Sequence, residues 1–394
     1  MSKLSNVISK RIQQLNPSPT LGLDAKVKRL QAEGIFVVNL GLGEPDFVTP
    51  WYIRRAAIAA IKAGFTHYTV TAGIPELREA ICKKLLKENG VSCHPSEIVV
   101  GVGTKQLLYH AFQVLCEEGD EVIVPIPTWS TYIEQIKLSG ATPALVFLKP
   151  PFRLTAEDLK KRITPKTKVI LLNSPSNPTG AVIEKEQLIK IAKLAVEKSI
   201  FVISDEIYEK ITFGKKHHSI ASLGKKIKQL IVTINGFSKS YAMTGWRIGY
   251  AAGPKEIIEA MVSLQSQTTS NTSSIAQKAA LAALVGPQEP VELMRLGFEK
   301  RRGYLIRELS KIKEVSFVPP DGAFYFFVGI KQLLGRQFRS SKEWCQKLLE
   351  EEKVAVVPGE AFMYPGYFRL SLATSMEHLK EGVKRIKSFI KKYD

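Results

Sequence analysis

Short runs of apolar and β-branched residues alternate with longer amphipathic segments through the middle of the chain. Five runs are predicted as strands, at 97–100, 121–124, 168–172, 200–204 and 230–234. Between most of them lies a segment with apolar residues at helical spacing, such as 185–198. Buried strands that alternate with helices predict an α/β fold, a mostly parallel sheet covered on both faces. Ligands bind such sheets beyond the carboxyl ends of the strands.

The last third of the chain has a different pattern. Strand-like runs at 323–328 and 368–372 flank helical segments, and a helix ends the sequence. Thr374 and Glu377 form a predicted capping box at its start. Apolar residues follow at spacings of three and four: Met376, Leu379, Val383, Ile386 and Ile390. This region, 291–394, is predicted to be a smaller α+β domain beside a large domain at 47–290.

Composition places the chain among globular proteins. Its 394 residues are 45% hydrophobic and favour two packed units. The sequence has no run of 18 or more apolar residues and no signal-peptide pattern near its start, so we expect no membrane association and a cytoplasmic location. Four cysteines without a C-x-x-C pair predict reduced thiols and no metal site.

The formal net charge of +19 is unusual. A basic surface attracts nucleic acids, membranes and anionic metabolites. The lysines are spread along the chain, however, and no zinc-finger, RNA-recognition or basic-zipper pattern accompanies them. We therefore expect no nucleic-acid partner.

Polar residues that suit catalysis follow three of the predicted strands. Asn177 lies in the turn 173–180, which contains two prolines, Pro175 and Pro178, and a glycine, and Asp205 follows the strand 200–204. Lys239 follows the strand 230–234, where an amine among apolar groups loses its proton readily. Each has a plain alternative: an ordinary turn, a helix N-cap and a solvated lysine.

The spacing makes these three positions informative together. The intervals from Asn177 to Asp205 (205 − 177 = 28) and from Asp205 to Lys239 (239 − 205 = 34) each suit one strand–helix–strand crossover. All three loops are therefore predicted to open on the same edge of the sheet. Arg247 suits a phosphate, and the glycine-rich segment 101–105 opens a helix whose first amides suit an anion.

Taken together, the motifs resemble the fold type I pyridoxal-phosphate aminotransferases. The matching motifs are Asn-Pro-x-Gly, Asp-x-x-Tyr and Ser-Lys-x-x-x-x-x-Gly-x-Arg, in this order, and further matches lie at 41–46, 68–79 and 368–371. The resemblance runs from about Ser18 to the C-terminus. It implies a seven-stranded, mostly parallel sheet flanked by helices, and an N-terminal segment, 1–46, that packs with the small domain.

The resemblance also implies roles for individual residues. Lys239 would hold pyridoxal 5′-phosphate as a Schiff base and then act as the general acid/base. Asp205 would pair with the ring nitrogen, which makes the ring an electron sink. Tyr208 and Asn177 would hydrogen-bond the ring's phenolic oxygen, and Trp129 would stack on the ring. The implied phosphate cradle is Gly103, Thr104, Lys105, Ser238 and Arg247, with Tyr68 reaching the phosphate of a partner subunit in a homodimer whose active sites lie at the interface.

The expected substrates are small amino acids and 2-oxo acids. Arg369 would grip the α-carboxylate, helped by Asn177, Trp129 and the backbone of Gly43. The chain lacks an arginine between Arg247 and Arg295, where one aspartate-aminotransferase subgroup has one. It resembles instead the bacterial and plastid subgroup, in which Ser18, Thr20 and Lys105 would recognise the distal carboxylate. Pro19 departs from the small residue that is common there.

The sequence thus predicts amino transfer from L-aspartate to 2-oxoglutarate by a ping-pong mechanism. Three alternatives on the same scaffold stay open: a prephenate aminotransferase, an aromatic or broad-specificity aminotransferase, and a carbon–sulfur lyase. A basic binding protein with a vestigial fold is an alternative of a different class. A nicotinamide-dependent dehydrogenase is disfavoured because the glycine fingerprint is incomplete.

Overall fold

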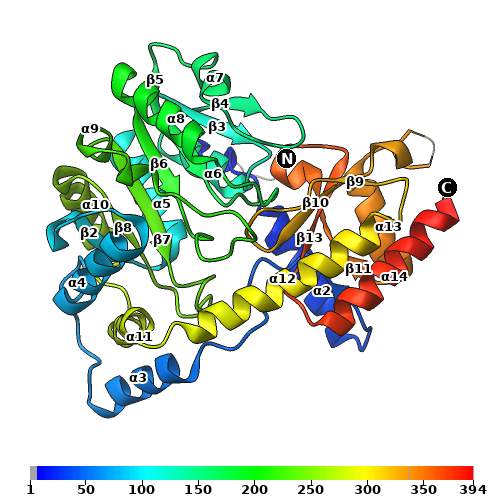
Figure 1. Ribbon diagram of the computed structural model, residues 1–394, viewed down its shortest axis with the longest axis horizontal. Coiled ribbons are helices and arrows are strands. Elements are labelled where there is room, and N and C mark those ends of the chain that lie inside the picture. Colours follow the sequence, from blue (N-terminus) through cyan, green and yellow to red (C-terminus); the bar gives the residue numbers. More distant parts are fainter. Residues whose placement is uncertain (1–6, 336, 394) are drawn as a thin grey trace.

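A seven-stranded sheet forms the centre of the larger part of the molecule (Figure 1). The computed structural model describes residues 7–335 and 337–393. The strand order is β2-β8-β7-β6-β5-β3-β4, in which β8 runs antiparallel to both neighbours and the other pairings are parallel. The strands are β2 (Ile98–Gly101), β3 (Glu121–Ile126), β4 (Thr142–Phe147), β5 (Thr167–Asn173), β6 (Phe201–Asp205), β7 (Ile231–Gly236) and β8 (Gly249–Ala252). The predicted α/β fold class is confirmed.

Alternate residues of the central strands enter two separate apolar cores. On β5, Val169 and Leu171 pack into one core, and Ile170 and Leu172 into the other. The same alternation is present on β6, where Ile203 and Val202 take opposite faces. Burying one such side chain stabilises the fold by about 1.5–3 kcal/mol. Helices must therefore cover both faces of the sheet to exclude water from these side chains.

Helices from most of the first 285 residues supply that cover (Figure 1). One core includes residues of α5, α6 and α10, and the other includes residues of α3, α4, α8 and α11. The helices are α3 (Trp51–Lys62), α4 (Pro75–Lys84), α5 (Gly103–Leu115), α6 (Ser130–Leu138), α7 (Ala156–Lys160), α8 (Lys185–Lys198), α9 (Lys225–Lys228), α10 (Lys255–Thr268) and α11 (Ser274–Val285), with shorter turns η2 (Leu85–Asn89), η3 (Pro95–Glu97) and η4 (Ile220–Ser222).

The C-terminal part has its own sheet and core. Its four strands are ordered β12-β13-β10-β9, and the long helix α12 (Glu289–Leu309) connects it to the larger part (Figure 1). Its elements are β9 (Ser316–Phe317), β10 (Tyr325–Gly329), η5 (Lys331–Leu333), α13 (Ser341–Glu352), β11 (Val354–Ala355), β12 (Val357–Pro358), η6 (Gly359–Phe362), β13 (Tyr367–Ser371) and α14 (Met376–Tyr393).

The N-terminal segment contacts this C-terminal part. It contains α1 (Lys10–Gln13), α2 (Pro19–Ala32) and β1 (Val38–Asn39), and β1 pairs in parallel with β11. Val27 and Val37 share a small apolar cluster with Leu349 and Ala355. The domain boundaries at 46/47 and 290/291 stay predictions, and the second falls in the first turn of α12.

Three local features differ from expectation. Strands β4 and β8 were not predicted from the sequence. The cap of α14 is also different: the Ser375 hydroxyl accepts from the backbone N–H of His378 at 3.1 Å, so the N-cap is Ser375 rather than Thr374. The helix therefore begins one residue later than the Thr374–Glu377 capping box implies. Among residues 7–335 and 337–393, no helix combines the length and the apolar composition needed to cross a membrane.

Candidate active site

A cavity of about 350 Å³ opens where the carboxyl ends of β5, β6 and β7 face the N-terminal segment and β13. Thirteen of the residues singled out in the sequence line it: Ser18, Thr20, Gly43, Thr104, Lys105, Trp129, Asn177, Asp205, Tyr208, Ser238, Lys239, Arg247 and Arg369. The predicted convergence of the three strand-end loops is therefore present in the structure. Gly103 lies beside this cavity, at the start of α5.

The amine of Lys239 is directed into the cavity and donates a hydrogen bond to the carbonyl of Gly43. Burial lowers the pKa of Lys239 to about 8, with Arg369 and Arg247 adding to this effect and Glu44 and Asp205 opposing it. The lysine is held in place because it follows β7, all six residues of which are buried. A neutral amine is therefore accessible near neutral pH, as a nucleophile or base requires.

Asp205 is the last residue of β6 and is only 2% exposed. Burial raises its pKa to about 6, although hydrogen bonds from the Tyr132 hydroxyl (2.7 Å) and the backbone N–H of Ile207 (3.2 Å) favour the charged form. A buried carboxylate of this kind is costly without a cationic partner. The site is therefore suited to a ligand that brings a positive charge to Asp205.

Arg369, on β13, is a buried guanidinium. It donates to the side-chain oxygen of Asn177 at 3.0 Å and to the carbonyl of Gly41 at 2.9 Å, and it lies over the ring of Tyr325 at 4.2 Å. Its Nε has no hydrogen-bond partner among the described residues, and burial lowers its pKa. A buried cation with a free N–H is suited to binding a carboxylate.

The N-terminus of α5 and Arg247 form a second positive region. Gly103, the first residue of α5, has a φ of +76°, and a Cβ built on it would lie 2.7 Å from Nη2 of Arg247. Arg247 itself has a φ of +53°, a strained conformation for this residue. Free helix amides, an arginine and the nearby Lys105 and Ser238 together make a site for an anion such as phosphate.

Aromatic residues line the space between these charged groups. The hydroxyls of Tyr208 and Tyr325 are 3.1 Å apart, and both residues line the cavity. Trp129 is the N-cap residue of α6, its ring lies edge-to-face with Tyr132, and the Lys105 amine is 4.9 Å from the centre of the Trp129 ring. A flat ligand would find apolar surface here.

Ser18 and Thr20 reach the same cavity from the N-terminal segment. Their hydroxyls are 3.1 Å apart, and Lys105 lines the cavity with them. The amine of Lys105 has a pKa lowered by burial and by the charge of Arg247. The structure thus brings together the three residues expected to bind a distal carboxylate.

Tyr68 does not join this group within one chain. It is 91% exposed and is not among the residues that line the cavity. The role implied for it in the sequence requires a second copy of the chain.

A buried charge cluster includes the residues that directly follow Asp205 and Tyr208 in the sequence. We use this name for Lys84, Glu206, Glu209 and His217. Lys84 pairs with Glu209, Asn89 donates to Glu209 at 2.6 Å, and His217 lies 3.2 Å from Glu206. Burial opposes a charge on His217, but Glu206 and Glu209 outweigh it and raise the pKa of His217. The cluster anchors the loop after β6 to α4 and η2.

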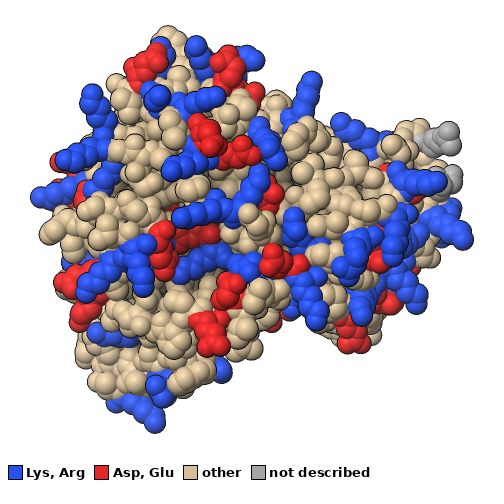
Figure 2. Space-filling view, in the orientation of Figure 1, with Lys and Arg blue, Asp and Glu red and all other residues tan. Residues whose placement is uncertain are grey.

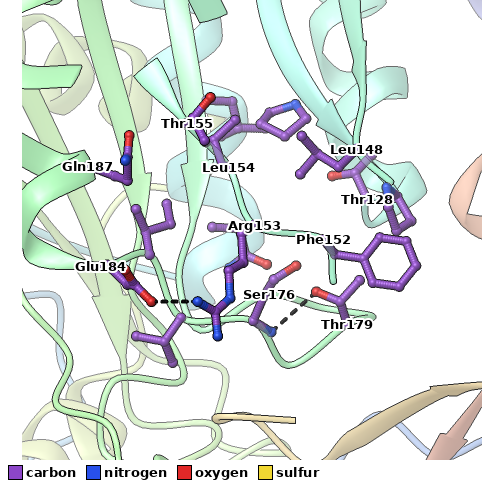
Figure 3. A pocket seen from close by; sticks show the side chains of 17 residues that line it. Thr128, Leu148, Phe152, Arg153, Leu154, Thr155, Ser176, Thr179, Glu184 and Gln187 are labelled. Carbon is purple, nitrogen blue, oxygen red and sulfur yellow. Dashed lines mark hydrogen bonds and ion pairs between the residues drawn. The ribbon is translucent and has the colours of Figure 1, made fainter. Parts of the chain in front are cut away.

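A second cavity, of about 120 Å³, is lined in part by Ser176 and Thr179 of the turn 173–180 (Figure 3). Its wall is mostly apolar, and its charged pair, Arg153 and Glu184, is already joined at 2.9 Å. Thr179 accepts from the backbone N–H of Ala181 at 3.2 Å. Because its charged groups, Arg153 and Glu184, are paired with each other, this cavity lacks the converging charges of the first.

Several cavity residues were missed in the sequence. Tyr132 binds Asp205, Tyr325 packs on Arg369, and the Glu44 carboxylate accepts from Thr244 at 2.7 Å. Tyr132 had a local signal, because it lies three residues after Trp129 and shares a helix face with it. Tyr325 had none, since its position depends on the pairing of β10 with β13.

The fold and this site define an aminotransferase. The model of the family described as aminotransferase class I and II matches residues 36–386, and the chain belongs to this family.

Named relatives cover almost the whole chain. It is 48% identical to an aspartate aminotransferase of Geobacillus stearothermophilus (97% of this chain, 98% of that protein) and 50% identical to a probable aspartate/prephenate aminotransferase of Aquifex aeolicus (96% and 98%). The solved structure of aspartate aminotransferase from Thermus thermophilus with maleate matches with a TM-score of 0.93 at 41% identity, covering 97% of this chain and 99% of that one.

Proposed function

We propose that this chain is a pyridoxal-phosphate-dependent aspartate aminotransferase. The observation that carries the proposal is the arrangement of three features around one cavity. These are a lysine with a lowered pKa, a buried carboxylate, and an anion site formed by a helix N-terminus and an arginine. Enzymes of the matched family use this cofactor. The names of the relatives support aspartate as the amino donor.

The described residues fit the cofactor. Asp205 would oppose the ring nitrogen, and Gly103, Thr104, Lys105, Ser238 and Arg247 would hold the phosphate. Trp129 would cover one ring face, and Tyr208 and Asn177 would hydrogen-bond the phenolic oxygen. When bound, pyridoxal phosphate supplies an aldehyde that forms an imine with amines and a ring that draws electrons from Cα.

Lys239 performs two tasks in this proposal. Its amine would hold the cofactor and, once displaced by the incoming amino acid, would take the proton from Cα at Nζ and deliver it to the cofactor carbon that is bonded to the transferred nitrogen. Both tasks need the neutral amine, which the lowered pKa makes available. Asp205 keeps the ring nitrogen charged, because a buried carboxylate is stabilised by an adjacent cation.

Substrate orientation follows from two positive regions of the cavity. Arg369, with Asn177, Trp129 and the backbone of Gly43 nearby, would bind the α-carboxylate. Ser18, Thr20 and Lys105 would bind the distal carboxylate of aspartate, and then of 2-oxoglutarate. A dicarboxylate held at both ends presents Cα to Lys239, and this is the source of the expected specificity.

A second candidate substrate is prephenate, with glutamate or aspartate as donor. It is favoured by one observation, the 50% identity to a probable aspartate/prephenate aminotransferase. Half-reactions with purified enzyme would separate the candidates: each donor or oxo acid is added alone, and the cofactor's visible spectrum is followed. A response to aspartate and 2-oxoglutarate is expected, and failure with both would reject the proposal.

A homodimer in the cytoplasm completes the proposal. Exposed apolar side chains on and near α3, α11 and α12 support a subunit interface: Val48, Trp51, Ile58, Ile61, Val70, Val285, Leu293 and Leu296. Basic side chains are instead scattered over the visible face, with a dense group over the C-terminal part (Figure 2). Tyr68, which is 91% exposed, would complete the phosphate site of the other subunit.

The covalent link offers the decisive experiment. Borohydride reduction of the cofactor-loaded enzyme, followed by peptide mapping, is expected to place the label on Lys239 alone. A label at another residue, or none, would contradict the proposal.

A further inference from the structure

We propose that Glu134 is a positioning residue, which holds Ser18 and Thr20 at the mouth of the cavity by fixing Asn16. This inference rests on the proposed function, since it concerns how the distal carboxylate of the substrate is recognised. Glu134 lies outside the cavity, in the second turn of α6.

The contact between Asn16 and Glu134 uses both carboxylate oxygens. Oε2 of Glu134 accepts from the backbone N–H of Asn16 at 3.1 Å, and Oε1 accepts from the Asn16 side-chain amide at 3.1 Å. The residues are 118 positions apart in the sequence. Two bonds to one residue, one of them to its main chain, fix both the position and the direction of the chain at that point.

The segment after Asn16 is stiff enough to carry this restraint forward. Prolines occupy positions 17 and 19, and each fixes its own φ and restricts the residue before it. Pro19 is also the first residue of α2. Ser18 and Thr20 lie between and directly after these fixed points, with their hydroxyls 3.1 Å apart. Anchoring Asn16 therefore sets where both hydroxyls lie.

The other end of the contact belongs to the same helix that orders the rest of this subsite. Trp129 caps α6, and the side chain of Gln135 donates to the backbone carbonyl of Lys105 at 2.8 Å. Consecutive residues of α6, Glu134 and Gln135, thus bind the segment that carries Ser18 and Thr20 and the backbone of Lys105. One helix holds all three residues of the distal-carboxylate subsite in register.

Glu134 is suited to this task electrostatically. Its side chain is 19% exposed, and Lys137 lies 3.2 Å from Oε1. Burial opposes ionisation, but the hydrogen bonds from Asn16 and Lys137 outweigh it and lower the pKa of Glu134. The carboxylate is therefore charged at neutral pH, and its bonds to Asn16 are the stronger, charge-assisted kind.

Glu134→Ala is the test variant. The KM for L-aspartate is expected to rise about three- to tenfold, as the loss of two partly exposed hydrogen bonds implies, with kcat within about twofold of wild type. The half-reaction with L-alanine, which has no distal carboxylate, should be unchanged. Glu134→Gln keeps one acceptor and should lie between, and Lys137→Met, which spares both bonds to Asn16, serves as the matched control. Calorimetric titration with maleate, which measures binding without turnover, should rank the affinities of these variants in the same order.

Limited trypsin digestion tests the contact independently of catalysis. Cleavage after Arg11 and Lys26, on either side of Asn16, should be faster in Glu134→Ala than in wild type or Lys137→Met. Equal cleavage, or an equal loss with aspartate and alanine, would overturn the inference. A wild-type enzyme that accepts neither aspartate nor maleate would instead reject the proposed function, and the digestion result would still decide whether Glu134 holds the segment.

Discussion

Individual side chains of the site carry charges that the fold alone does not balance well. Asp205 and Arg369 are each only 2% exposed, and burial shifts the pKa of each toward the neutral form. Burial also lowers the pKa of Lys239. Such groups destabilise the empty protein and are stabilised when a ligand of opposite charge binds. The residues that cost stability are therefore those that we expect to bind cofactor and substrate.

Uptake of the cofactor by the cofactor-free protein should depend on pH through Lys239. Only the neutral amine attacks an aldehyde, and the pKa of about 8 means that the neutral fraction falls about tenfold for each pH unit below this value. The uptake rate should therefore rise with pH and level off above pH 8. Stopped-flow absorbance between pH 6 and 9 measures it. A rate that still rises tenfold per pH unit at pH 9, as for an ordinary lysine, would contradict the assignment.

Tyr132→Phe should weaken cofactor binding most in acid. The Tyr132 hydroxyl bonds the ionised form of Asp205, so its loss raises the pKa of Asp205 further above 6. At pH 8 the carboxylate stays charged, and at pH 6 it becomes mainly protonated and unable to pair with the ring nitrogen. Equilibrium dialysis should show a loss of affinity of about tenfold at pH 6 and a smaller one at pH 8.

The control for this variant is Tyr304→Phe, which removes a hydroxyl from α12. It should leave the affinity unchanged at both pH values. An equal loss at pH 6 and pH 8 in Tyr132→Phe would mean that the hydroxyl acts through packing rather than through the charge of Asp205.

At the residue scale, the sequence indicated the charged members of the site but not their supports. Lys239, Asp205 and Asn177 follow predicted strands, and this position, their spacing and the motifs around them marked them. Tyr325 and Gly41 contact Arg369 through pairings between distant segments. Such contacts leave no local pattern, because they depend on which strands become neighbours.

At the scale of elements, the site is a set of strand-to-helix turns. The strand β2 ends at Gly101 and α5 begins at Gly103, which places the helix N-terminus beside Arg247. The anion site thus depends on where α5 begins, because the first turn of a helix exposes unpaired backbone amides.

Gly103→Ala should damage this site in two ways. A φ of +76° costs about 1–2 kcal/mol for a residue with a Cβ, and the new methyl group would contact Arg247 at 2.7 Å. We expect lower stability and a cofactor affinity reduced by at least about tenfold, as the loss of one charged contact implies. Denaturant unfolding and equilibrium dialysis measure the two effects.

The matched control is Gly214→Ala. Gly214 has the same φ of +76°, but a Cβ there meets no atom within 4 Å. It should show the loss of stability without the loss of affinity. If both variants bind the cofactor equally, Gly103 is needed for its backbone conformation alone.

Most of the central strands could be predicted because they are continuous apolar runs, buried on both faces. The two strands that were missed, β4 and β8, lack such a run for physical reasons. β4 contains Pro143 and ends at Phe147, which is 63% exposed, as suits an edge strand. β8 is only four residues, with one glycine and two alanines, and such residues have low strand propensity. The strand β8 is held in the sheet by its antiparallel pairing with β2 and β7, which its own sequence does not indicate.

On the scale of the whole molecule, the proposed site includes a residue from a second chain. Tyr68 is exposed in the segment that follows α3, and Trp51, Ile58 and Ile61 of α3 are exposed as well. A monomer rarely leaves so many large apolar side chains in water. Sedimentation should therefore show a dimer.

Hybrid dimers test whether Tyr68 acts across that interface. Lys239→Ala should be inactive and Tyr68→Ala impaired in cofactor binding. Co-expression with two tags yields a dimer in which one site has both native residues, Lys239 from one subunit and Tyr68 from the other. Its activity should be about half that of wild type. A hybrid with only half the activity of Tyr68→Ala would show that Tyr68 acts within its own chain.

The hydrogen bond from Arg369 to the carbonyl of Gly41 spans 328 positions, and this bears on the order in which a growing chain acquires its abilities. Arg369 is made 130 residues after Lys239 (369 − 239 = 130). At about 5–20 residues per second, that is a delay of roughly 7–26 s. A nascent chain on the ribosome therefore contains Asp205 and Lys239, which we propose bind the cofactor, before it contains the arginine that we propose binds the amino acid. Under this proposal, cofactor binding can begin earlier in synthesis than catalysis.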